Sequence, residues 1–252
     1  VLGWSGSKGS ATKFDADDYY WTLGKCREIE DVLVKHIDIM DKYDPKKRVG
    51  LIVDEWGTWW DEEPGTISGH LNQQNTLRDA FVASLSFDIF HKYTDRIQMT
   101  NIAQMVNVLQ SMILTKDEKM TLTPTYHVFR MYNVHQDATY LPIELNSKTM
   151  DVRDNRTIPL LSATASKNKE GVIHISLSNV HLTEAQEVVI AIDELKKGNV
   201  TGEILVSNSI DDHNTFDNPN KVAPKEFKGA KFSKGNLVVK LPPKSIVTLA
   251  IN

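Results

Sequence analysis

The spacing of hydrophobic positions changes near Thr139 and divides the chain into two parts. Before this point, apolar residues recur every three or four positions over about 15–40, 72–93 and 124–134, which predicts helices with one apolar face. Two apolar runs, 49–53 and 96–102, lie between or beside these segments and predict strands. Residues 104–114 are apolar without a clear period, so helix and loop both stay open there.

Helices that alternate with strands are typical of βα units and of a parallel sheet. The run 49–53 is continuously apolar and rich in β-branched residues, which favours a strand buried on both faces. The first part of the chain is therefore predicted to be α/β.

The second part shows a different pattern. Apolar and polar residues alternate at 173–177, 188–192, 237–241 and 247–251, with Gly, Asn and Pro between the runs. Alternation with a period of two predicts antiparallel strands with one buried and one exposed face. We expect this part to be a β-sandwich in which polar residues such as His174, Ser176 and Ser178 face outward.

Composition excludes several classes of protein. The 252 residues are 40% hydrophobic and carry a formal net charge of -4, so the chain is not of the disordered class. Acidic and basic residues are interspersed without a basic run, and no apolar stretch approaches the ~20 residues that span a membrane. One cysteine, Cys26, excludes a disulfide within the chain and a multi-cysteine metal site. We expect no cofactor, metal, nucleic acid or membrane as a partner.

The segment 54–60 concentrates candidate chemistry directly after the predicted strand 49–53. Asp54 and Glu55 supply carboxylates, and three tryptophans follow, among them Trp59. Carboxylates act as acid, base or nucleophile in glycoside hydrolysis, and catalytic groups of α/β barrels lie at the carboxyl ends of strands. The alternative interpretation is that the acids only face solvent and the tryptophans belong to the core.

This segment, with its Asp54-Glu55-Trp56-Gly57 motif, also resembles a known family. The stretch 48–60 is similar to the nucleophile strand of α-L-arabinofuranosidases of glycoside hydrolase family 51. The similarity continues in order through 73–80, 101–110, 122–129, 134–138, 213–216 and 241–245. One such motif is weak, but several ordered blocks over nearly the whole chain are specific.

The resemblance implies a retaining, exo-acting hydrolase that removes terminal arabinofuranosyl groups from plant polysaccharides or oligosaccharides. Glu55 would be the nucleophile, Trp59 would belong to the substrate pocket, and Gln104 would hydrogen-bond the arabinose. Asp54 is expected to shape the strand end, and Asn101 could serve structure or site. The family's general acid is a Glu that follows an Asn, yet no Asn in this chain is followed by Glu. Its His-Tyr-Tyr segment is also missing.

The resemblance also implies the fold. Residues 1–138 would be the C-terminal part of a (β/α)8 barrel, and 139–252 a jelly-roll-like β-sandwich. A complete barrel takes about 250 residues by itself, so the expectation is a fragment of a longer protein that is inactive alone. The parent would be a homo-oligomer, a hexamer in the family.

A different class of function stays open. The β-rich part is alternatively a non-catalytic carbohydrate-binding or assembly module. Its aromatic residues, Tyr140, Phe216, Phe227 and Phe232, are scattered, which does not favour a platform of rings for sugar stacking. Localisation, whether cytoplasmic, periplasmic or secreted, is not determined by the sequence.

Overall fold

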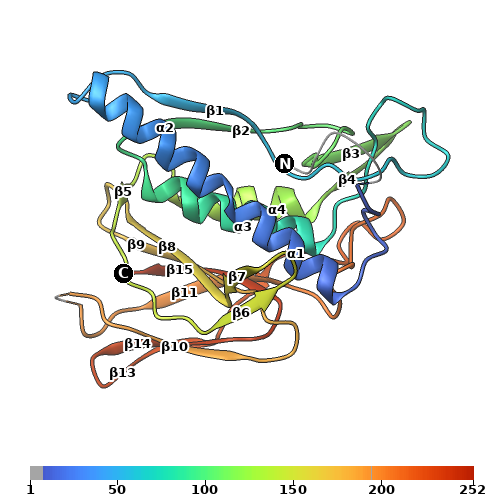
Figure 1. The fold of residues 1–252 in the computed structure, drawn as a ribbon. Helices are drawn as coiled ribbons and strands as arrows, with labels where there is room; N and C mark the ends of the chain where they lie inside the picture. The colour runs from blue at the N-terminus through green and yellow to red at the C-terminus, as the bar shows by residue number, and fades with distance from the viewer. Residues whose placement is uncertain (1–7, 194) are drawn as a thin grey trace.

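A computed structural model describes residues 8–193 and 195–252, and Figure 1 shows their arrangement in layers. The helices are α1 (Ala16–Arg27), α2 (Ile29–Tyr43), α3 (Leu77–Lys92) and α4 (Pro124–Tyr132), followed by a 3-10 turn at Asn133–His135. The strands of the first part are β1 (Leu51–Trp56), β2 (Ile97–Ile102), β3 (Ile113–Lys116) and β4 (Lys119–Leu122). Those of the second part are β5 (Thr139–Tyr140), β6 (Thr149–Val152), β7 (Arg156–Pro159), β8 (Leu161–Lys167), β9 (Ile173–Asn179), β10 (Gln186–Ile190), β11 (Val200–Val206), β12 (Lys225–Glu226), β13 (Ala230–Ser233), β14 (Asn236–Leu241) and β15 (Ser245–Ile251).

The predicted helices are present, but one prediction is wrong in detail. The segment 15–40 is not a single helix: α1 ends at Arg27, Glu28 lies in a turn, and α2 begins at Ile29. Asp15 caps α1 by accepting a hydrogen bond from the Asp18 amide at 2.9 Å. Residues 104–114 form a loop that leads into the β3–β4 hairpin, which the apolar pattern did not predict.

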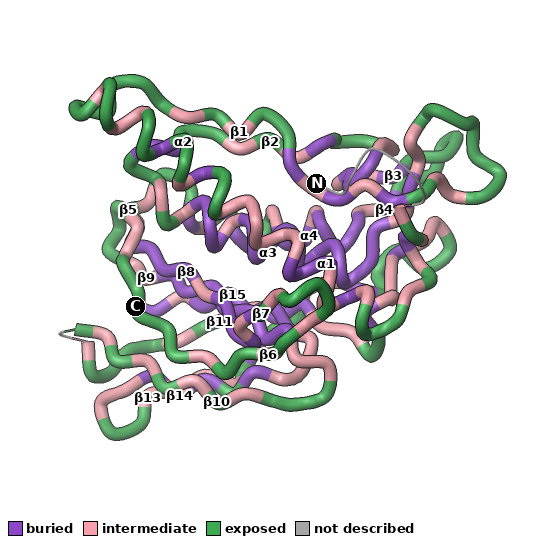
Figure 2. The backbone as a smooth tube through the Cα atoms, viewed as in Figure 1, coloured by how far each residue is buried: buried purple, intermediate pink, exposed green. Residues whose placement is uncertain are grey.

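Strands β1 and β2 pair in parallel, as predicted, but β1 is not buried on both faces. Ile52 and Met99 are register partners, and their side chains are 50% and 54% exposed. Leu51 and Val53 point the other way and pack against the main core. The reason is that the described residues cover only the inner face of this two-stranded sheet. Figure 2 shows the resulting exposed outer layer above the helices.

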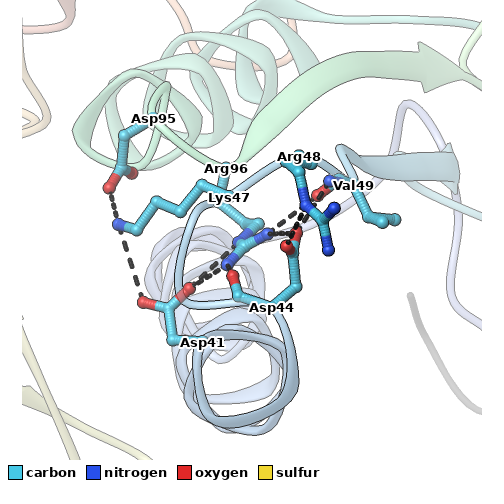
Figure 3. A network of polar contacts seen from close by, with 7 residues as sticks. All are labelled: Asp41, Asp44, Lys47, Arg48, Val49, Asp95 and Arg96. Atoms are coloured by element: carbon cyan, nitrogen blue, oxygen red, sulfur yellow. Dashed lines mark hydrogen bonds and ion pairs between the residues drawn. The ribbon is translucent and has the colours of Figure 1, made fainter.

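Arg96 joins the end of α2 to the starts of β1 and β2 (Figure 3). Its side chain is completely buried and donates to the Val49 carbonyl at 2.8 Å and to the Asp44 carboxylate at 3.1 Å. It also bonds the Asp41 carboxylate, and this hydrogen bond holds the pKa of Asp41 below its usual range. The Val49 amide lowers the pKa of Asp44 in the same way. The Arg96 guanidinium thus donates hydrogen bonds to backbone carbonyl groups of this turn that would otherwise be buried without a partner.

The second part forms the predicted antiparallel sheets. Six strands lie in the order β12-β11-β15-β9-β8-β5, and three lie in the order β10-β14-β13. The facing sides of the two sheets bury an apolar cluster that includes Leu177, Leu237, Val239, Val247 and Leu249. The four alternating runs coincide with β9, β10, β14 and β15, so the β-rich character of this part is confirmed. Among the described strands, only β1 and β2 pair in parallel, apart from an isolated parallel bridge between Val106 and Ile113, and no closed barrel exists among the described residues.

The outer face of the six-stranded sheet differs from the prediction, because it is covered rather than exposed. His174, Ser176 and Ser178 are all buried. The Ser178 hydroxyl donates to the Ser84 hydroxyl of α3 at 3.0 Å, and Ser176 lies 2.8 Å from His135 Nε2. The helical layer seen above the sheet in Figure 1 provides this cover, and polar partners make the burial of hydroxyl groups tolerable.

Asp88 of α3 is the most deeply buried acid of this interface. It accepts hydrogen bonds from the Tyr132 hydroxyl at 3.0 Å and from the Ser162 hydroxyl at 2.6 Å. Burial nevertheless raises the pKa of Asp88 to about 7. In the same layer, burial lowers the pKa of His91 to about 4 and that of His135 to about 3. The interface therefore favours the neutral form of all three groups.

These pKa shifts have opposite effects on stability. The folded pKa of Asp88 lies above its unfolded value of about 3.9, so its favourable contribution is lost as pH rises toward 7. His91 and His135 have folded pKa values below the unfolded value of about 6.5. Their contribution is complete above that value and is lost as pH falls toward 4 and 3.

We predict that Asp88→Asn stabilises the protein more at pH 8 than at pH 5. The amide keeps the size of the side chain but has no charge to bury, whereas folded Asp88 is ionised at pH 8. The difference between the two pH values is about 2 kcal/mol in the free energy of unfolding, measured by chemical denaturation.

The matched control is Asp38→Asn, because Asp38 is exposed on α2. This variant is expected to follow the wild-type stability at both pH values to within about 0.5 kcal/mol. A pH-independent effect of Asp88→Asn would contradict the ionisation of a buried carboxyl group.

Candidate active site at the end of β1

The last two residues of β1 differ in burial. Trp56 is 4% exposed and packs between Phe87, Phe90 and Phe129, with ring centroids 5.4 to 5.9 Å apart. Glu55, one position earlier, is exposed, and the register of the strand is irregular between Val53 and Trp56. The aromatic anchor of Trp56 fixes the strand end, and with it the position of the candidate nucleophile.

Glu55 and Trp59 line the same small cavity, of about 60 Å³, together with Gly57, Ala103 and Leu109. The structure thus brings together two of the three predicted site residues. Trp59 is half-buried and its ring lies 5.0 Å from Lys8 Nζ. Trp60, in contrast, is buried in the core. The core interpretation of the tryptophans therefore holds for Trp56 and Trp60, and the role of Trp59 at the cavity stays a prediction.

Gln104 lies next to this cavity without lining it. It follows Ala103, whose amide donates to the Trp56 carbonyl at 3.0 Å, and its own side chain is exposed. Asp54 and Asn101 are also exposed and lie outside the lining. Among the described residues of the lining, Glu55 is the single carboxylate.

A buried polar network holds the loop that carries Trp59. Asp79 of α3 accepts hydrogen bonds from the Thr58 hydroxyl and from Trp60 Nε1, both at 2.8 Å. Gln110 accepts from the Thr58 amide at 2.8 Å, and Gln73 accepts from the Trp60 amide at 2.7 Å. The backbone amides of Thr58 and Trp60 are thereby paired with buried side chains, which fixes the loop where it meets the cavity.

The sequence analysis did not assign these network residues to the site. Asp79 and Gln73 lie in the similar block 73–80, and Gln110 ends the block 101–110. The blocks of similarity therefore included these residues. The sequence pattern alone does not show whether such polar side chains are buried or lie on the surface.

Arg78 connects the same loop to the N-terminal segment. Its guanidinium lies 3.6 Å from the ring centroids of both Phe14 and Trp60. It donates to the carbonyls of Ser10 and Ala11 at 3.2 and 3.1 Å. Burial lowers the pKa of Arg78 to about 10, so the side chain keeps its charge at neutral pH.

Three further observations concern the described residues outside this cavity. Within 8–193 and 195–252, no cluster of three or more His, Cys, Asp or Glu residues is arranged to hold a metal ion. No described helix is long and apolar enough to cross a membrane. Phe227 is buried and Phe232 packs in the sandwich core, so these two rings do not form a sugar-stacking platform.

Comparison with known proteins identifies the family. Residues 54–245 match the family described as "Alpha-L-arabinofuranosidase C-terminal domain". The chain belongs to this family. It is 68% identical over 251 residues to a Bacteroides ovatus protein named intracellular exo-α-L-arabinofuranosidase, and covers 49% of that protein. A Streptomyces lividans protein, named intracellular exo-α-(1->5)-L-arabinofuranosidase, is 23% identical over 231 residues, with 86% of this chain and 34% of the relative covered.

Solved structures agree with this assignment. The GH51 arabinofuranosidase from Xanthomonas axonopodis pv. citri superimposes with a TM-score of 0.95 and 46% identity, covering 99% of this chain and 50% of that one. The resemblance to family 51 α-L-arabinofuranosidases is therefore confirmed. The chain spans about half the length of these relatives.

We predict that Asp79→Ala lowers the free energy of unfolding by about 3 kcal/mol. The substitution removes the acceptor of Thr58, Trp60 and the Thr76 amide, and leaves buried donors without partners. Chemical denaturation followed by tryptophan fluorescence measures the loss.

Asp31→Ala is the matched control, because Asp31 occupies the same third position of α2 but is exposed. Its expected effect is below about 1 kcal/mol. Equal effects of the two substitutions would show that the buried network contributes nothing beyond the position in the helix.

Proposed function

We propose that this chain contributes the nucleophile to a retaining, exo-acting α-L-arabinofuranosidase. The observation that carries the proposal is the cavity shared by Glu55 and Trp59 at the carboxyl end of a parallel strand. Catalytic groups of α/β barrels occupy this position, and the chain belongs to an arabinofuranosidase family. The name of the Bacteroides ovatus relative supports the exo mode of action.

The proposed domain assignment follows from the sheets. Residues 1–138 would be the C-terminal portion of a (β/α)8 barrel, and 139–252 a jelly-roll-like β-sandwich domain. The parallel pairing of β1 and β2 supports this, and so does their exposed apolar outer face, which carries Ile52 and Met99. Strands of parallel barrels are buried on both faces, and such a face becomes buried when further barrel segments are present.

The proposed reaction has two steps. The Glu55 carboxylate attacks the anomeric carbon of a terminal arabinofuranosyl group while a second carboxyl group gives its proton to the departing oxygen. A glycosyl–enzyme ester forms, and water, deprotonated by the second carboxylate, then releases arabinose and frees Glu55. Trp59 would pack against the sugar ring, and Gln104 would hydrogen-bond a sugar hydroxyl from the neighbouring strand end.

The second carboxyl group would come from outside this chain. Retaining enzymes place the two carboxyl groups about 5–5.5 Å apart. Glu55 has no second carboxylate with it among the described residues that line its cavity, and no Asn-Glu pair exists in the sequence. The natural ligand is proposed to be an arabinose-containing oligo- or polysaccharide, and assembly into a homo-oligomer is proposed on the resemblance alone.

We predict that the 252-residue chain does not turn over an aryl α-L-arabinofuranoside, because it holds one carboxylate of a pair. In a protein extended to the length of the relatives, Glu55→Gln is expected to lower kcat by at least about 10³-fold. Release of the aryl group, followed by absorbance, measures both.

Glu118→Gln serves as the control, since Glu118 is exposed at the turn of the β3–β4 hairpin outside the Glu55 cavity, and it should retain turnover. Turnover by the chain alone that Glu55→Gln abolishes would contradict the need for a second carboxylate. Full activity of Glu55→Gln in the longer protein would overturn the assignment of the nucleophile.

A further inference from the structure

A second, larger cleft opens where three segments distant in sequence meet. It has a volume of about 420 Å³ and lies between the loop 63–74, the β3–β4 hairpin and the segment 213–216. Figure 1 shows the hairpin and the long loops beside it at one end of the molecule. The cleft shares no lining residue with the cavity of Glu55. Its volume falls within the range of about 300–1,000 Å³ that is usual for small-molecule sites.

The lining of this cleft is polar without net charge. Amide side chains come from Asn72, Gln74 and Asn107, and hydroxyl groups come from threonines. One acid, Glu63, is balanced by one base, Lys116. A set of uncharged donors and acceptors suits a neutral ligand with many hydroxyl groups rather than an anion or a cation.

Two rings complete the lining. His213 and Phe216 come from the same short segment of the second part of the chain, and both are half-buried. An aromatic face beside polar amides matches a sugar ring, which presents C–H groups on its faces and hydroxyl groups at its edge.

The walls of the cleft are fixed by hydrogen bonds. The Asn107 side chain accepts from the Thr115 amide at 2.7 Å and donates to the Thr115 hydroxyl at 2.8 Å. Gln74 Nε2 donates to the Asn214 carbonyl at 3.2 Å, and Asn214 Nδ2 donates to the Leu122 carbonyl at 2.8 Å. Loop, hairpin and segment 213–216 are thereby held together, so little ordering is needed when a ligand enters.

Other polar groups of the lining remain available. The side-chain amide of Asn72 and the ammonium group of Lys116 form no hydrogen bond or ion pair with the described residues. Both are therefore free to bond a ligand at the two sides of the cleft, since Asn72 lies on the loop and Lys116 on the hairpin.

We propose that this cleft binds a short neutral oligosaccharide, with Phe216 as the stacking ring and Asn72 as a hydrogen-bonding group. The site would hold a part of the carbohydrate chain that is separate from the terminal sugar at Glu55. The lining of the cleft is the reason for proposing a carbohydrate as its ligand. The choice of an arabinose oligosaccharide as one probe rests on the proposed function.

Isothermal titration calorimetry of the full chain with α-1,5-arabinotriose, xylotriose and cellotriose tests the proposal. Phe216→Ala is expected to weaken binding about tenfold or more, and Asn72→Ala about fivefold. Ile67→Ala is the matched control on the same loop, because Ile67 is exposed outside the lining, and it should change affinity less than twofold. Unfolding midpoints of all variants show whether each one is folded, and Asn72→Ala removes no side-chain hydrogen bond to the described residues.

The outcomes separate this site from the proposed catalytic site. Binding of any of the three sugars that Phe216→Ala and Asn72→Ala both weaken supports the cleft. Binding of xylotriose or cellotriose without arabinotriose supports the cleft as a carbohydrate site and shows that its ligand is not a chain of arabinose units. If none of the three sugars binds, the proposal that this cleft is a carbohydrate site is overturned. Binding that Glu55→Gln abolishes and Phe216→Ala leaves unchanged also overturns it, because the sugar then binds at the cavity of Glu55.

Discussion

The buried first turn of α3 is the constraint on which the arrangement of this protein depends. The Asp79 carboxylate takes hydrogen bonds from Thr76, Thr58 and Trp60, which belong to the helix start and to the loop after β1. In the same turn, the amides of Leu77 and Arg78 donate to the carbonyls of Asp212 and Ile210, which follow β11. A helix start normally leaves such donors unpaired, and here the segment that follows β11 accepts from two of them, while the loop after β1 donates to Asp79. The position of one helix therefore sets the site loop and the sandwich relative to each other.

The same helix explains why the sheet below it is polar on its outer side. Nearly every residue of α3 is buried, so the helix lies between the β1–β2 pair and the six-stranded sheet, as Figure 2 shows. Ser84 and Asp88 point to hydroxyl groups of that sheet and pair with Ser178 and Ser162. Serines that alternate with apolar residues in β9 thus serve a polar contact between layers and not a solvent-exposed surface. Their burial joins the helical part and the sandwich into one packed unit.

Both cavities lie beside loops at the edge of this packed unit. The cavity of Glu55 and Trp59 and the larger cleft near Phe216 both use the loop that leaves β1. Two buried side chains hold this loop. Asp79 accepts a hydrogen bond from the Thr58 hydroxyl, and Gln73 accepts one from the Trp60 amide. The chain belongs to an arabinofuranosidase family and spans about half the length of its relatives, and both proposed sites lie beside this anchored loop.

The sequence by itself located the main helical segments and six of the strands, identified the family, and led to the candidate residues of the first cavity. Periods of 3.6 and 2 located the helices and strands because local spacing decides which residues share one face. The ordered blocks led to Glu55 and Trp59, which the structure places in one cavity. Only the tertiary structure decided what covers each face. It exposed Ile52, buried Ser176 and turned Asp79, Gln73 and Gln110 toward a loop. Covering a face depends on segments far apart in sequence, so no local pattern contains it.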